Sequence, residues 1–195
     1  MNKNKIQTTI YCFLTRINPS WNIKLKYFQF YKKRLNVKHP VTFVEKLLTL
    51  RIKCYNDSHF VETCANKVDV RDFVRRRGFG NLLNDVYGVY DSVDDIPWDN
   101  LPDSFAMKWN FGATYNIICA DKNLLDINKA KSQMRTWGGT KYYLPFAEMQ
   151  YSRVKKRILV EKYLDAKQGF LPYDYKLYCF NGHVECIYLL QIVTI

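Results

Sequence analysis

The first half of the chain has apolar positions at helical spacing. Thr42 and Glu45 form a capping-box pattern ahead of an apolar run, which predicts a helix from about residue 43 to residue 55. The polar stretch 57–66 indicates a loop. A second helix is predicted over residues 68–77, because a glycine follows it and three arginines near its end would complement the helix dipole.

The second half alternates apolar and polar positions with the period of β-strands. Strands are predicted over residues 82–90, 105–109, 115–120, 157–161, 173–180 and 183–195. An acidic, proline-containing connector is predicted over residues 92–103, and Asp126 can cap a helix that ends at Gly138. Asn181-Gly182 between two apolar runs is a strong hairpin signal. Helices and strands in this order predict an α+β fold.

Composition is that of a globular domain. The chain has 195 residues, of which 48% are hydrophobic and 25% charged, and its apolar runs are far shorter than the ~20 residues that span a bilayer. The start lacks a secretory-signal pattern, so we expect a cytoplasmic location. The six cysteines and three histidines show no metal-ligand spacing, and we expect mostly buried thiols and no metal site.

Positive charge is concentrated at the N-terminus. The net charge is +12, and residues 1–40 contain nine Lys or Arg and no Asp or Glu. The other 21 basic residues face 18 acidic ones, a net of +3, so the body of the chain does not have the charge of a nucleic-acid-binding surface. In the basic segment, lysines alternate with aromatics such as Trp21 and Phe28. This pattern favours peripheral contact with an anionic membrane, a surface for an acidic polymer, or a helix packed on the domain by its aromatics.

Three features of the second half suggest chemistry. Lys108 ends a short apolar strand before a glycine-containing turn, where its ammonium and the turn amides can approach a phosphate. Glu161 stands at a strand end that can pair with a flat heterocycle. Asp174 and Lys176 share one face of a predicted strand. Each feature alone is also what a surface lysine or a cross-strand ion pair would produce.

In this order along the chain, these residues and Lys67 resemble the nucleotide site of the ATP-grasp superfamily. Further motifs between residues 40 and 190 are similar to the TupA-like ATP-grasp family: Phe43-Val44-Glu45-Lys46-Leu47, Cys64-Ala65-Asn66-Lys67 with Arg71, Gly88-Val89-Tyr90-Asp91-Ser92, Leu101-Pro102-Asp103-Ser104-Phe105, Tyr115-Asn116-Ile117-Ile118, Asp174-Tyr175-Lys176 and Phe180-Asn181-Gly182. The resemblance implies a small nucleotide-binding lobe plus the first strands of an incomplete large lobe. We therefore divide the chain into a basic segment 1–40, a lead-in region 41–100, a small lobe with hinge 101–164 and a large-lobe start 165–195.

The resemblance also implies roles for individual residues. Lys67 and Lys108 would contact ATP phosphates, and Gly112 belongs to the small-lobe loop that covers them. Glu161 would meet the adenine amino group, and the backbone from Lys162 to Leu164 would read the purine edge.

Asp174 and Lys176 would stand at the entry to the large lobe, with Lys176 acting at the acyl-phosphate region. The implied reaction joins a carboxylate and an amine through an acyl phosphate, with Mg²⁺ as the family's metal. Family members are associated with teichuronopeptide, capsular and other cell-surface polysaccharide synthesis, and many carry a glycosyltransferase label.

Two departures from the family pattern change this expectation. The loop is Asn110-Phe111-Gly112-Ala113-Thr114, where the family normally has Asn-His-Gly-Ser-Gly, so closure over phosphate should be poorer. The chain also ends on an apolar strand before the family's magnesium ligands. We expect a truncated protein that has no ligands for Mg²⁺ and shows little or no ligase activity by itself.

Two other functions fit the sequence. A glycosyltransferase of capsule synthesis could use Asp94-Asp95 to bind a metal and a nucleotide sugar, although these residues lie in the predicted connector. Alternatively, the chain is a non-catalytic module whose basic N-terminus binds a polyanion or a membrane.

Overall fold

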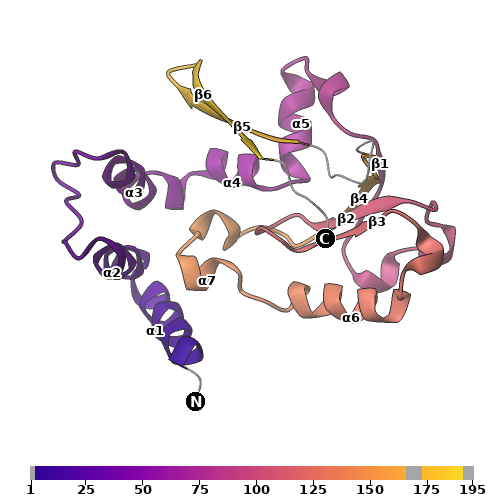
Figure 1. The fold of residues 1–195 in the computed structure, drawn as a ribbon, viewed down its shortest axis with the longest axis horizontal. Coiled ribbons are helices and arrows are strands. Elements are labelled where there is room, and N and C mark those ends of the chain that lie inside the picture. Colours follow the sequence, from indigo (N-terminus) through magenta and orange to yellow (C-terminus); the bar gives the residue numbers. More distant parts are fainter. Residues whose placement is uncertain (1–2, 166–172, 191–195) are drawn as a thin grey trace.

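The computed structural model describes residues 3–165 and 173–190 (Figure 1). A four-stranded antiparallel sheet has the order β1-β4-β2-β3. Its strands are β1 (Val86–Tyr90), β2 (Phe105–Trp109), β3 (Asn116–Cys119) and β4 (Ile158–Lys162). A separate hairpin pairs β5 (Asp174–Phe180) with β6 (His183–Leu190). Together with the helices, these sheets confirm the predicted α+β class.

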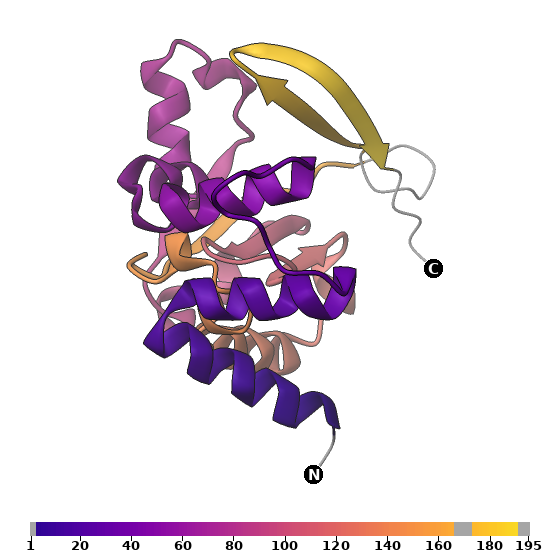
Figure 2. The same ribbon diagram turned by 90° about the vertical axis from the view of Figure 1, so that its left-hand side faces the viewer.

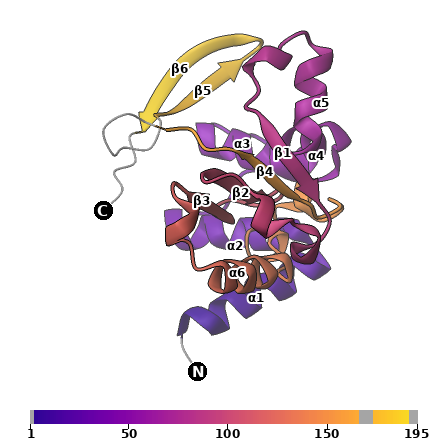
Figure 3. The ribbon, with the colours of Figure 1, turned by 90° about the vertical axis from the view of Figure 1, so that its right-hand side faces the viewer.

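Seven α-helices occur among the described residues. They are α1 (Lys3–Ile17), α2 (Pro19–Tyr31), α3 (Phe43–Lys53), α4 (His59–Ala65), α5 (Asp69–Arg76), α6 (Ile127–Gly138) and α7 (Tyr143–Phe146). Helix α6 lies along one face of the four-stranded sheet (Figure 3). The first three helices follow one another along one side of the molecule, with α1 farthest from the hairpin (Figure 2). No helix among the described residues is long and apolar enough to cross a membrane.

The alternation of side chains in β2 and β4 separates the core from the opposite sheet face. Phe105, Met107 and Trp109 of β2 pack with Ile158 and Val160 of β4 in the core that also contains residues of α6. The intervening residues of both strands face the other way, because successive side chains point to opposite sides of a sheet. One face of the sheet packs in this core, and the other carries Ala106, Lys108, Leu159 and Glu161.

Local signals predicted several elements well. Thr42 caps α3, with its side chain accepting from the Glu45 N–H and the Glu45 carboxylate accepting from the Thr42 N–H, as the capping box requires. Asp126 accepts from the Lys129 N–H at the start of α6. The Asn181-Gly182 turn has positive φ at both residues, which is the hairpin geometry this dipeptide favours.

The predicted loop over residues 57–66 is wrong, because most of it forms α4. Ser58 caps this helix by accepting a hydrogen bond from the Val61 N–H at 3.3 Å. Phe60 packs edge-on against Phe73 of α5, with 5.4 Å between ring centroids. The stretch therefore forms a short helix in which no residue is fully buried.

One predicted boundary in residues 82–103 is wrong. The first strand begins at Val86 rather than residue 82, because residues 80–82 form a 3-10 turn. The connector over residues 92–103 lies outside the sheet, as predicted, and Asp94 and Asp95 are exposed. Its apolar residues enter the core: Val93, Ile96, Trp98 and Leu101.

The basic N-terminal segment forms a helical pair that is anchored by buried polar groups. The Asn22 amide donates to Thr15 Oγ1 at 2.7 Å and to the Leu144 carbonyl at 3.3 Å, and Thr15 Oγ1 donates to the same carbonyl at 2.8 Å. Tyr27 and Ile23 of α2 are buried against the domain. Packing by part of the aromatic set therefore occurs, while other apolar side chains of the segment remain exposed.

The cysteines differ from expectation. All six thiols are free, and only Cys119 is buried, whereas Cys54, Cys64, Cys179 and Cys186 are exposed. Cys179 and Cys186 lie on β5 and β6, where side chains on both faces of the hairpin are exposed.

The burial of the Glu45 carboxylate leads to a prediction about acid stability. Its oxygens accept from the Val41 and Thr42 N–H groups at 3.0 Å and from the Tyr27 hydroxyl at 2.9 Å. These hydrogen bonds, those from the backbone above all, lower the pKa of Glu45 from 4.5 to about 2. The native carboxylate therefore stays ionised at a pH where the unfolded one is protonated.

We expect the free energy of unfolding to fall as the pH drops from about 4.5 to about 2, because the unfolded state takes up the proton first. Glu45→Gln should be less stable at pH 7 and lose less stability across this window, as measured by urea unfolding at a series of pH values. Glu185→Gln, on the exposed strand β6, is the matched control. The prediction would be contradicted if the free energy of unfolding of Glu45→Gln fell with pH as steeply as that of the unmodified chain.

Candidate functional site

Lys108 and Glu161 lie together on the sheet face that is opposite the core. In the β2–β4 register, Ala106 is paired with Glu161 and Lys108 with Leu159, so the two charged side chains are diagonal neighbours. The Lys108 ammonium donates to Glu161 Oε1. Glu161 is buried, and its charge needs a partner there.

A second cation approaches the other oxygen of Glu161. Arg71 of α5 lies 3.8 Å from Oε2, which is longer than a hydrogen bond, and its guanidinium donates to the Asn84 carbonyl. Arg71 is itself buried. Glu161 is therefore held between Lys108 and Arg71, while Oε2 keeps the capacity to accept from a ligand.

A small pocket opens beside the Lys108–Glu161 pair. Its volume is about 130 Å³, and it is lined by Ala106, Lys108, Ile118, Glu161 and the segment from Lys162 to Leu164. Sites for drug-sized ligands usually enclose ~300 to 1,000 Å³. The pocket is therefore the size of a flat ring system rather than of a complete nucleotide.

The pKa of Lys67, which lies near Lys108, is lower than that of an ordinary lysine. Its ammonium donates to the Gly112 carbonyl at 2.6 Å. Burial and, to a smaller extent, the positive charge of Lys108 lower the pKa of Lys67 from 10.5 to about 8. The positive charges of Lys67 and Lys108 repel each other, and an anionic ligand bound between them would offset this repulsion.

Gly112 is required by the geometry of the β2–β3 turn. Its φ is +69°, and a β-carbon would lie 2.8 Å from the ring of Tyr142. Thr114 also has a positive φ of +66°, in the left-handed region that a β-branched residue rarely adopts. Phe111 is buried against Trp109, with 5.6 Å between ring centroids, so this apolar replacement serves the core.

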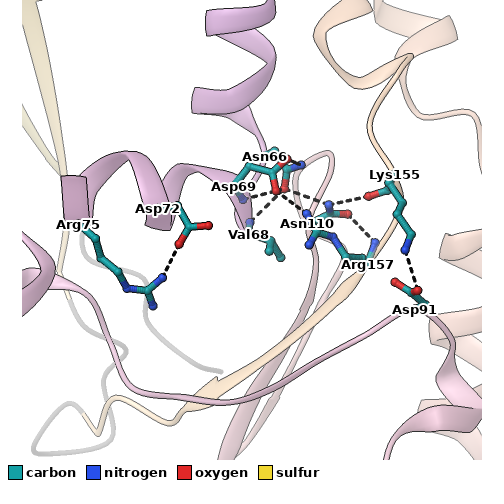
Figure 4. A network of polar contacts seen from close by, with 9 residues as sticks. All are labelled: Asn66, Val68, Asp69, Asp72, Arg75, Asp91, Asn110, Lys155 and Arg157. Carbon is teal, nitrogen blue, oxygen red and sulfur yellow. Dashed lines mark hydrogen bonds and ion pairs between the residues drawn. The ribbon is translucent and has the colours of Figure 1, made fainter. Parts of the chain in front are cut away.

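The two buried amides of Asn66 and Asn110 contact each other at the centre of a polar network (Figure 4). The Asn110 amide donates to Asn66 Oδ1 and to the Lys155 carbonyl, both at 2.9 Å, and its Oδ1 accepts from the Arg157 N–H at 2.9 Å. The Lys67 N–H donates to the Asn110 carbonyl at 3.0 Å. The amide pair thus joins the start of α5, the end of β2 and the approach to β4.

Asp69 and Arg157 extend the same network as an ion pair between α5 and the residue before β4. Asn66 Oδ1 also accepts from the Val68 N–H at 3.0 Å, which stabilises the turn that leads into α5. Sequence reasoning assigned no role to Asn66, Arg71, Asn110 or Arg157, although Asn66, Arg71 and Asn110 stand within the motifs noted above. The contacts that join Asn66 to Asn110 and Asn110 to Arg157 span 44 and 47 positions of the chain.

Asp174 and Lys176 lie elsewhere. They form an ion pair with each other at 2.5 Å on the exposed hairpin, which touches the rest of the molecule where Phe180 packs edge-on against Phe43. Among residues 3–165 and 173–190, no hydrogen bond or ion pair joins them to Lys67, Lys108 or Glu161. The structure therefore brings together Lys67, Lys108, Gly112, Glu161 and the segment from Lys162 to Leu164, and it keeps Asp174 and Lys176 apart from them.

The carboxylates do not form a metal site in the described part of the chain. No group of three or more His, Cys, Asp or Glu side chains is placed there to hold an ion. Asp94 pairs with Arg135, and Asp95 accepts from the Ser92 N–H at 3.0 Å. These local contacts account for both residues of the acidic pair.

The largest hollows are not at this site. One of about 330 Å³ lies between the start of α2 and residues 56–57, and others lie along α1. These hollows are lined by exposed charges such as Lys5 and Arg16 or Asp57 and Arg153, and none of them is lined by a buried carboxylate that is paired with a lysine, as Glu161 is beside β4. Chemistry rather than size therefore selects the Lys108–Glu161 pocket as the candidate site.

Residues 45–193 match the family described as TupA-like ATPgrasp. The match covers more than two thirds of the chain and includes every residue that the structure brings together around the pocket. No curated protein and no solved structure matches the chain.

The acidity of Lys67 can be measured by its reaction with an amine-directed acylating reagent. Because only the neutral amine reacts, we expect the labelling rate of Lys67 to reach half its maximum near pH 8, whereas ordinary lysines titrate near pH 10.4. Peptide mass spectrometry after brief labelling from pH 6 to pH 11 gives the midpoint. Lys108→Gln removes a neighbouring charge and should raise the midpoint, but not to 10.4, because burial remains. A midpoint above pH 10 in the unmodified chain would contradict this account of the site.

The Asn66–Asn110 pair should be among the most sensitive positions in the fold. Asn110→Ala leaves the buried Asn66 oxygen, the Lys155 carbonyl and the Arg157 N–H with fewer partners, at an expected cost of about 3 kcal/mol. Urea unfolding measures the loss. Asn123→Ala, at an exposed 3-10 turn, is the matched control and should change stability by less than about 1 kcal/mol. A loss as small at Asn110 as at Asn123 would mean that the network does not organise the site.

Proposed function

The chain belongs to the TupA-like ATP-grasp family, and from this premise we propose that it binds ATP in the pocket beside Lys108 and Glu161. The observation that carries the proposal is the ion pair between Lys108 and the buried Glu161, which borders a pocket the size of a base. Lys67, whose pKa is lowered to about 8, lies beside this pair. Cations for phosphate, an acceptor for an amino group and a flat apolar pocket are the components that a purine nucleotide requires.

The two lysines would neutralise the phosphates. Lys67 and Lys108 lie close enough for each charge to affect the other, and a polyanion between them would relieve this repulsion. The pKa of Lys67 would then rise. At pH 8, where about half of Lys67 is neutral, phosphate binding should therefore be accompanied by proton uptake.

The segment after β4 is suited to contact the base. The Lys162 N–H donates to the Asp85 carbonyl at 2.9 Å, and the Lys162 carbonyl accepts from the Asn84 amide at 2.8 Å. The backbone of Tyr163 and Leu164 makes no hydrogen bond with the other described residues, so its polar groups are available to a purine edge. Glu161 Oε2 would accept from the exocyclic amino group.

The reaction we propose is that of a carboxylate–amine ligase in cell-surface polysaccharide or teichuronopeptide synthesis. Bound ATP would supply the phosphoryl group that activates a carboxylate for attack by an amine. This reaction, the lobe boundaries 101–164 and 165–195, and the roles of Asp174 and Lys176 rest on the family resemblance. The carboxylates of the described residues do not fit a magnesium site, and we assign no step to that ion.

ATP binding tests the proposal directly. Isothermal titration at pH 8 should show that Lys108→Gln or Lys67→Gln weakens ATP binding about 10- to 100-fold, as expected when a charge-assisted contact is lost. Binding of adenosine should change little in the two lysine variants and should weaken in Glu161→Gln. Titration in two buffers of different ionisation enthalpy should reveal the proton uptake, and Lys67→Gln should abolish it.

Lys129→Gln is the matched control, because Lys129 is exposed on α6. Equal ATP affinity in the unmodified chain, Lys108→Gln and Lys129→Gln would rule out this pocket as the phosphate site. Hydroxylamine, which converts an acyl phosphate to a hydroxamate, separates the ligase reaction from nucleotide binding alone.

A further inference from the structure

Helix α1 carries an exposed apolar stripe. Ile6, Ile10, Phe13 and Ile17 are 39%, 46%, 58% and 53% exposed. Their spacing of four, three and four residues puts them on one face of the helix, and at 1.5 Å per residue the stripe is about 17 Å long. Single exposed apolar residues are common on protein surfaces, but a contiguous stripe marks an interaction surface.

The stripe does not hold α1 on the domain. That contact is made by another face, where Thr15 is buried and donates to the Leu144 carbonyl, and where Asn22 of α2 donates to Thr15. Helix α1 lies at the edge of the molecule in all three ribbon views, with α2 and α7 as its neighbours (Figures 1–3). The stripe is therefore free to meet a partner without any change in the fold.

Charge around the stripe decides which partner fits. Lys5 and Arg16 are exposed on α1, and their helical positions place both along the same side of the stripe. Residues 1–40 contain nine basic residues and no acidic one. A second copy of the chain would present the same charge and be repelled, whereas an anionic surface with an apolar interior complements both features.

We propose that α1 docks on an anionic lipid surface. The helix would lie in the plane of the interface, with the four apolar side chains at the level of the upper acyl chains and with Lys5 and Arg16 among the headgroups. Its 15 residues are fewer than the ~20 that cross a bilayer, so the contact is peripheral. The surface is separate from the Lys108–Glu161 pocket, and the proposal does not depend on nucleotide binding.

Vesicle co-sedimentation of the full chain tests the stripe. Binding is compared on vesicles of phosphatidylcholine alone and on vesicles with about 30% phosphatidylserine. We expect binding only to the second, and a weakening of at least tenfold in Ile10→Gln/Phe13→Gln. The matched control is Leu82→Gln/Leu124→Gln, which changes two residues that are 73% and 85% exposed outside α1 and should bind as the unmodified chain does.

The charge contribution has its own pair of variants. Lys5→Gln/Arg16→Gln should weaken binding to the anionic vesicles about 25-fold, because each basic side chain near such a surface contributes about fivefold. Lys46→Gln/Lys129→Gln, with both changes at exposed lysines outside residues 1–40, should have less effect. Unchanged urea unfolding midpoints show that the variants remain folded.

Several results would overturn the proposal. These are the absence of binding to anionic vesicles, equal binding to neutral ones, and stripe variants that bind as well as the unmodified chain. If soluble heparin binds the chain and its affinity depends on Lys5 and Arg16 but not on the stripe, the surface is a polyanion site instead. If sedimentation velocity without lipid shows a dimer that the stripe variants abolish, the stripe is a self-association surface instead.

Discussion

The site depends on two buried amides that must satisfy one another. Asn66 and Asn110 are 44 positions apart in the chain, and each would lose a hydrogen bond in the interior if the other moved. Their contact fixes the entry to α5 against the end of β2, and the Arg157 N–H ties the start of β4 to the same point. Lys67, Gly112 and Glu161 come from three separate parts of the chain, and this junction sets their relative positions.

The strands predicted over residues 105–109, 115–120 and 157–161 are confirmed, and so are several elements specified by neighbouring residues. Three such features are the Thr42–Glu45 capping box, the Asp126 cap and the Asn181-Gly182 turn. Each involves residues no more than four positions apart, so both interacting residues can be recognised in one short stretch of sequence. Helix α4 was missed because it has only seven residues, none of them fully buried, and because it packs on α5 and on residues 149–151, which are distant in the chain. The acidic connector was predicted, but the packing of its four apolar residues in the core was not, because their partners belong to distant elements.

The family resemblance identified several residues of the candidate site, but not the residues that position them. Lys67, Lys108 and Glu161 were noted as candidates because of their types and order. Arg71 approaches Glu161 only after α5 has packed beside the sheet, and no sequence spacing encodes a distance of that kind. The resemblance also grouped Asp174 and Lys176 with the pocket, whereas the structure pairs them with each other on a separate hairpin.

The short helix α7 has a consequence for communication within the molecule. Its Leu144 carbonyl receives the hydrogen bonds that anchor α1 and α2, and the adjoining Tyr142 ring packs against Gly112 in the β2–β3 turn. The segment from Tyr142 to Phe146 therefore contacts both the N-terminal helices and the turn that carries the Lys67 contact. Moving this segment would disturb two separate contacts, the hydrogen bonds at the Leu144 carbonyl and the packing of the Tyr142 ring on Gly112.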